Sequence, residues 1–233
     1  MRSPAEKVMK SLLILGAGGF GHMIQETAKL LGYEKAVFLD DAVRDPDVVG
    51  KCCDYESFLG QYDTAVAALG DNNMRLHWTE KLMEAGYDVP AIIHPSAVVS
   101  PSASVGKGSF IMQRAIVNTH TVVEHGVLIN SGAVVDHDSY VERGAHIGLG
   151  SVVKANCRIA SKVKVEAGEV IFSTRRKIDG VEDRNLEDAI YAFGFGNTCS
   201  YVKPFGAGHI NETYAVYMPG QDGDELSYVL QRV

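Results

Sequence analysis

The chain has 233 residues, of which 46% are hydrophobic and 22% are charged, and its 22 basic and 29 acidic side chains give a formal charge of −7. This composition is typical of a soluble globular protein with one large or two small domains. A net negative chain without a lysine- or arginine-rich run lacks the positive surface that nucleic acids and anionic membranes attract. We therefore expect neither as a partner.

We expect neither a targeting segment nor a disulfide framework in this chain. The apolar run 12–15 is too short for a signal peptide core or a membrane span, and it leads directly into a glycine loop. The four cysteines form no Cys-x-x-Cys pair, so they indicate neither a disulfide scaffold nor a metal clip. We expect a cytoplasmic protein with reduced thiols.

The N-terminal pattern is typical of a nucleotide-binding fold. The predicted elements are a buried strand at 10–15, a glycine loop at 16–21, a helix at 22–31 and a strand at 36–39. Asp40 and Asp41 follow the loop by about 20 residues, as in dinucleotide-binding folds. Such a loop lets backbone N–H groups approach a diphosphate at the helix N-terminus. In the simpler alternative, the glycines only connect a strand to a helix.

This α/β pattern ends early. It continues through a strand at 64–69 and a helix at 73–85, and then stops near Pro90. Half of a Rossmann unit suits one nucleotide better than two. A nucleotide-sugar oxidoreductase is therefore disfavoured, because residues 60–92 barely provide a second half-sheet.

A six-residue repeat fills the middle of the chain. In steps of six from Ile93 to Ile171, every position is isoleucine or valine, and the residue two places earlier is mostly small. This period predicts a parallel β-helix with three sides to a coil, so that residues 18 apart stack at about 4.8 Å. The repeat makes between about four and five coils.

Histidines are concentrated in the repeat, at His120, His125, His137 and His146. No stacked column holds two of them, which disfavours an all-histidine zinc site, and we expect no metal. One imidazole with a neighbouring carboxylate suits acid–base chemistry, and His137 is flanked by two. Asp138 is the preferred partner. Asp136 is the alternative, because adjacent side chains on a strand point to opposite faces.

Several motifs in this order resemble the sialic-acid O-acyltransferase-like (NeuD/PglD-like) family of bacterial sugar acyltransferases, over roughly residues 10–172. The motifs are the loop 16–21, the stretch 38–41, Gly70–Asn72, His94–Ala97 and the block 130–146. The resemblance implies a left-handed β-helix that forms a homotrimer, with acetyl-CoA between neighbouring prisms as acyl donor. It also implies an N-terminal domain that binds the sugar or nucleotide-sugar substrate.

The same resemblance implies roles for individual residues. His137 would be the general base that deprotonates the sugar amine or hydroxyl, and Asp138 would polarise it. The positions near the acetyl group are Asn130, His146 and a backbone N–H near Ala155. The substrate-binding positions are Gly18, Gly19, Phe20, Asp40 and Asp41. Some family members carry a histidine where this chain has Phe20.

The repeat is followed by a tail of different character. The tail predicts a short helix at 186–192, a strand, glycine loop and strand over 202–218, an acidic turn at 220–225 and a strand at 228–232. It resembles the start of an aminoglycoside-phosphotransferase-like sugar kinase, similar to N-acetylhexosamine kinases. Because the chain supplies no catalytic-loop aspartate and no metal-binding carboxylates, we expect part of a fused sugar kinase without kinase activity.

The sequence thus predicts three parts: a Rossmann-like α/β subdomain at 1–91, an all-β left-handed parallel β-helix at 92–172, and a linker with a short α+β tail at 173–233. The expected activity is acetyl-CoA-dependent O- or N-acetylation of a sugar or nucleotide-sugar in glycan biosynthesis, with His137 as base. The alternative is a non-catalytic trimeric scaffold that carries part of a sugar kinase.

Overall fold

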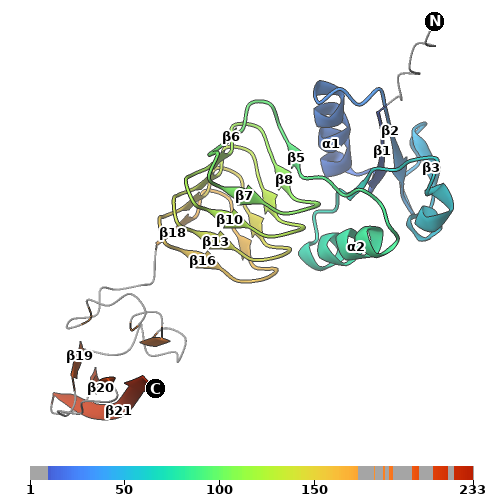
Figure 1. Ribbon diagram of the computed structural model, residues 1–233. Helices are drawn as coiled ribbons and strands as arrows, with labels where there is room; N and C mark the ends of the chain where they lie inside the picture. The colour runs from blue at the N-terminus through green and yellow to red at the C-terminus, as the bar shows by residue number, and fades with distance from the viewer. Residues whose placement is uncertain are drawn as a thin grey trace, which may run out of the picture. The chain divides into compact units, whose positions relative to one another are not determined.

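The computed structural model describes residues 10–172, 181, 186, 189–190, 201–204, 212–219 and 223–232 (Figure 1). The chain divides into two compact units between Phe172 and Ser173. None of the helices in the described residues has the length and apolarity of a membrane span.

The first unit begins with a parallel sheet in the order β3-β2-β1-β4. Its strands are β1 (Ser11–Leu15), β2 (Lys35–Leu39), β3 (Val48–Gly50) and β4 (Ala65–Ala67), and its helices are α1 (Gly19–Leu30), the 3₁₀ helix η1 (Cys52–Phe58) and α2 (Asn72–Glu84). This is the expected Rossmann-like arrangement. Helix α1 begins three residues earlier than predicted, because Gly18 is its N-cap and the glycine loop supplies its first turn.

The β-helix has fourteen two-residue strands in three parallel sheets, ordered β16-β13-β10-β7, β17-β14-β11-β8-β5 and β18-β15-β12-β9-β6 (Figure 1). The strands are β5 (Ile92–Ile93), β6 (Val98–Val99), β7 (Ser104–Val105), β8 (Phe110–Ile111), β9 (Ile116–Val117), β10 (Val122–Val123), β11 (Leu128–Ile129), β12 (Val134–Val135), β13 (Tyr140–Val141), β14 (His146–Ile147), β15 (Val152–Val153), β16 (Arg158–Ile159), β17 (Lys164–Val165) and β18 (Val170–Ile171).

The predicted register is confirmed, because each residue pairs with the one 18 positions away, as Val135 does with Val153. The second residue of each strand faces inward, and these isoleucines and valines form the core of the prism. The first residue faces outward. On the sheet that holds β8, the outward side chains Ile92, Phe110 and Leu128 share a core with α1 and β1, so the α/β part is packed onto the prism.

The second unit contains an antiparallel sheet in the order β19-β20-β21. Its strands are β19 (Tyr201–Pro204), β20 (Glu212–Pro219) and β21 (Asp224–Arg232). Val181, Ile190, Val202 and Val216 form its core. The short α+β tail is confirmed as a fold class, although most of the predicted helix 186–192, the glycine loop 205–211 and part of the acidic turn 220–225 lie outside the described residues.

Candidate active site

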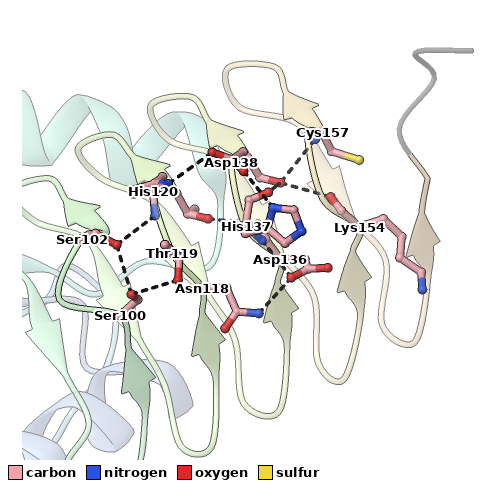
Figure 2. A network of polar contacts seen from close by, with 12 residues as sticks. Ser100, Ser102, Asn118, Thr119, His120, Asp136, His137, Asp138, Lys154 and Cys157 are labelled. Carbon is pink, nitrogen blue, oxygen red and sulfur yellow. Dashed lines mark hydrogen bonds and ion pairs between the residues drawn. The ribbon is translucent and has the colours of Figure 1, made fainter. Parts of the chain in front are cut away.

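His137 and Asp138 lie together on the corner that follows β12 (Figure 2). His137 Nδ1 is 2.8 Å from Asp138 Oδ2. Because a carboxylate only accepts hydrogen bonds, Nδ1 carries the proton and the Nε2 lone pair is left for another partner. The hydrogen bond to Asp138 raises the pKa of His137. The side chain is 51% exposed, so Nε2 can be reached from solvent.

The coil before this corner supplies a second histidine. His120 stacks on Asp138, and its Nδ1 lies 3.5 Å from Asp138 Oδ1, so the two carboxylate oxygens face two different imidazoles (Figure 2). The hydrogen bond from His137 is the largest cause of the lowered pKa of Asp138. The 18-residue period predicts that His120 stacks over Asp138, but it does not predict the contact between their side chains. In the described residues no group of three or more His, Cys, Asp or Glu side chains could hold a metal ion.

The other flanking carboxylate holds the turn and not the imidazole. Asp136 Oδ1 accepts from the backbone N–H of His137 at 2.9 Å and from Asn118 Nδ2 at 3.0 Å (Figure 2). These two donors lower the pKa of Asp136. Asp136 therefore remains ionised and stabilises the corner that presents His137.

Asn130, on the corner after β11, and His146, the first residue of β14, form a second polar pair. Asn130 Oδ1 accepts from the Ser131 N–H at 2.8 Å, which fixes the amide so that Nδ2 faces His146 Nε2 at 3.2 Å. Since Nδ2 is a donor, Nε2 is the acceptor and the proton of neutral His146 sits on Nδ1. That Nδ1 is buried without a hydrogen-bond partner in the described part of the chain.

His146 is therefore a poor candidate for a base. Burial, followed by the positive charge of Arg75, lowers the pKa of His146 to about 4, so the ring is neutral at physiological pH. Its lone pair is already occupied by Asn130. Of these two imidazoles, only His137 has both an exposed lone pair and a carboxylate on its other nitrogen.

The structure brings the predicted catalytic and acetyl-site residues together in two sets. Ala155 stacks next to His137, and its backbone N–H has no acceptor among the described residues. Asn130 lies on the corner that precedes β12 and contacts His146 of β14, and no hydrogen bond between described residues joins this pair to His137. One copy of the chain thus holds the predicted groups in two separate sets.

The glycine loop is shaped by close packing at two of its glycines. A Cβ on Gly16, at φ 102°, would lie 2.8 Å from Ala68 O, and one on Gly21 would lie 2.0 Å from Gly16 O. Gly18 and Gly19, by contrast, have open space around them. The backbone at the N-terminus of α1 is therefore accessible to a ligand.

Three further predicted substrate residues are engaged within the chain. Asp40 Oδ2 accepts from the Ala17 N–H at 2.8 Å, while its Oδ1 accepts from two N–H groups of its own turn. Asp41 accepts from the Cys52 N–H at 3.1 Å. The Phe20 ring packs edge-on against Phe110 of β8 with centroids 5.2 Å apart. These contacts hold the loop in place.

Comparison with known proteins identifies the family. The model of the PglD N-terminal domain matches residues 11–82. The acetyltransferase domain of PglB from Neisseria gonorrhoeae FA1090, solved in complex with acetyl coenzyme A, is similar with a TM-score of 0.62 and 32% identity, and the match covers 70% of this chain and 92% of that domain. The chain belongs to the NeuD/PglD-like family of sugar acyltransferases.

Two other relatives extend the comparison. PerB from Caulobacter crescentus, solved with CoA and GDP-perosamine, has a TM-score of 0.63 and 28% identity, with 70% of this chain and 88% of PerB covered. The UDP-N-acetylbacillosamine N-acetyltransferase of Bacillus subtilis (strain 168) is 32% identical over 117 residues, which are 45% of this chain and 52% of that protein. The match thus spans about half the length of this curated relative. None of the three relatives is named as a kinase, and the kinase likeness of the tail stays a prediction.

Proposed function

We propose that the chain is an acetyl-CoA-dependent N-acetyltransferase that acts on the amino group of a nucleotide-linked sugar. The observation that carries the proposal is the exposed His137–Asp138 pair, with a free Nε2 on a β-helix corner. The relatives support the acyl donor and the class of acceptor. PglB is solved with acetyl coenzyme A, PerB with CoA and GDP-perosamine, and the Bacillus protein is an N-acetyltransferase. Amine acetylation is therefore favoured over hydroxyl acetylation.

The chemistry follows from the geometry of the pair. Acetyl-CoA would supply the activated acyl group. As the sugar amine forms its bond to the thioester carbonyl carbon, His137 Nε2 takes a proton from that amine, and Asp138 stabilises the resulting imidazolium. The C–S bond then breaks, and His137 returns the proton to the departing sulfur. General-base catalysis of this kind contributes roughly 10²–10⁴ in rate. The Ala155 N–H is the donor proposed for the developing oxyanion.

A homotrimer is proposed from an apolar stripe on the outside of the prism. In the sheet that contains β12, every outward side chain is aliphatic: Val98, Ile116, Val134, Val152 and Val170. Val98 is 60% exposed and Val170 is 42% exposed. The outward column of the β10 sheet is mixed instead: Ser104, Val122, Tyr140 and Arg158. A continuous aliphatic column suits burial against a second copy.

The stripe also explains why the site residues form two sets. It lies between the corner of His137 and the corner of Asn130. Packing of neighbouring copies along the stripe would place His137 of one copy beside Asn130 and His146 of the next. The complete acetyl site is therefore proposed to lie between two copies, with Gly18 and Gly19 contacting the diphosphate of the nucleotide-sugar through backbone N–H groups.

The test is a thiol-release assay with acetyl-CoA and a panel of UDP-, GDP- and CMP-linked amino sugars, with the corresponding hydroxy sugars as controls. We expect release with at least one amino sugar, a product heavier by one acetyl group as an amide, and none with its hydroxy counterpart. Release with hydroxy sugars alone would show O-acetylation. A folded trimer that acetylates no member of the panel would favour the scaffold alternative.

A further inference from the structure

Arg75 of α2 is a fully buried charge that the proposed chemistry does not use. Its exposed fraction is 0%, and no salt bridge to it occurs within the described residues. A buried charge without a carboxylate partner is rare, because removal from water is costly unless every N–H is bonded. In this chain the guanidinium is surrounded by oxygen acceptors: the carbonyls of Leu69, Gly70, Gly126, Gly144 and Ala145 and the side chain of Asn72.

These acceptors belong to two separate regions. Arg75 Nη1 donates to Leu69 O at 3.1 Å, just beyond the carboxyl end of β4. That segment lies against the glycine loop, since a Cβ on Gly16 would be 2.8 Å from both Ala68 O and the Leu69 side chain. One guanidinium therefore contacts the edge of the α/β sheet where a nucleotide is expected to bind.

The other region adjoins the Asn130–His146 pair. Arg75 Nη2 donates to Gly144 O at 2.8 Å and to Ala145 O at 3.1 Å, and the next residue is His146. The charged groups that act on the His146 ring are Arg75, Lys164 and Glu166, and Asn130 donates to its Nε2. A proton on Nε2 would displace this amide donor and would lie close to a second positive charge.

We propose that Arg75 is a positioning residue: it ties the glycine-loop edge of the α/β part to the coil that carries His146, and its charge adds to the effect of burial in keeping this imidazole neutral, so that Nε2 accepts from Asn130. The catalytic consequence rests on the proposed function. Two properties of arginine are then separable. The positive charge affects the pKa of His146, and the several N–H donors of the guanidinium hold the two regions together.

Two substitutions separate these properties, and a third serves as control. Arg75→Gln removes the charge and keeps some N–H donors, whereas Arg75→Lys keeps the charge and loses the several N–H donors of the guanidinium. Thr79→Val changes the same face of α2 one turn further on, where Thr79 packs on Gly108 and Gly126 and its hydroxyl has no partner in the described residues. All three are made in the full chain, and folding is checked by circular dichroism.

The first readout is the titration of the His146 ring by NMR. We expect His146 not to titrate above about pH 5 in the wild type, in Thr79→Val and in Arg75→Lys, and its midpoint to rise in Arg75→Gln. The second readout is steady-state kinetics, in which Arg75→Lys raises KM for the nucleotide-sugar about tenfold with less effect on kcat.

An unchanged His146 midpoint in folded Arg75→Gln, or an equal shift in Thr79→Val, overturns the charge effect. An Arg75→Lys variant with wild-type KM overturns the link to the glycine loop, and this test of the link stands even if Arg75→Gln does not fold. The NMR titration needs no turnover, so failure of the proposed acetyl transfer is distinguishable from failure of this inference.

Discussion

His137 Nδ1 and Asp138 Oδ2 lie 2.8 Å apart although the two residues are adjacent in the chain. Adjacent side chains on a regular strand point to opposite faces, but Asp138 has a φ of 55° and lies on a corner. Aspartate tolerates this left-handed conformation better than most residues, and here its carboxylate reaches back to the preceding ring. A single turn therefore holds both members of the pair.

Asp138→Asn should move the pH dependence of acetyl transfer. The carboxylate raises the pKa of His137, so its replacement by an amide lowers that pKa. Because the unprotonated ring is the active form, the acidic limb of kcat/KM moves to lower pH. The plateau falls by roughly 10²–10⁴, because an amide N–H facing Nδ1 favours the wrong tautomer. Asparagine also tolerates the positive φ, so the corner should persist. An acidic limb at the wild-type position would show that Asp138 does not act on the base.

Asp40→Asn should weaken the glycine loop. Burial opposes the ionisation of Asp40, but the backbone donors at Ala17, Val43 and Ala42 together outweigh it and lower the pKa of this carboxyl group. Asparagine presents one acceptor oxygen in place of two, and loss of the bond to Ala17 costs about 1–3 kcal/mol. We expect a lower Tm and a higher KM for the nucleotide-sugar.

Asp41→Asn is the matched control, since Asp41 accepts a single backbone bond, from Cys52, and an amide oxygen can keep it.

Because the folded-state pKa of Asp40 is depressed, its contribution to the free energy of unfolding is present above the unfolded pKa, and it is lost as pH falls through the folded pKa. The Tm difference between Asp40→Asn and wild type should therefore shrink in acid. Equal Tm values for both variants at neutral pH would contradict this account of the loop.

Val134→Asp should dissociate the proposed trimer. Val134 lies in the middle of the aliphatic stripe, where an aspartate would be buried between copies without a partner. Val122→Asp makes the same change on the outward side of the β10 sheet and should leave the trimer intact. Light scattering after size exclusion measures both. A trimeric Val134→Asp variant would place the interface elsewhere.

The repeat explains why much of the prism could be predicted. A period of six places isoleucine or valine on the inner side of every strand. The 18-residue stacking that follows predicts, from the sequence alone, that His120 lies over Asp138. The Asn130–His146 hydrogen bond was not predictable in the same way. It depends on the rotation of an amide that is fixed by the Ser131 N–H.

The role of Arg75 was also hidden in the sequence. A lone arginine in a helix is usually solvated, and its burial depends on carbonyls at Gly126 and Gly144 that lie 51 and 69 residues away in the chain. Asp40 shows a similar limit. Its spacing from the glycine loop predicts a carboxylate that binds substrate. The three backbone hydrogen bonds that Asp40 accepts depend on the conformation of the local turn and could not be predicted from that spacing.

His137 is the proposed base for acetyl transfer, and every other role proposed for the site depends on it. The most direct test measures kcat/KM for the best amino-sugar acceptor in the wild type, in His137→Ala and in His120→Asn, whose asparagine tolerates the φ of 57° at that corner. We predict a fall of roughly 10²–10⁴ in His137→Ala with the trimer retained, and a much smaller change in His120→Asn. A trimeric His137→Ala variant that acetylates the acceptor at the wild-type rate would contradict the account.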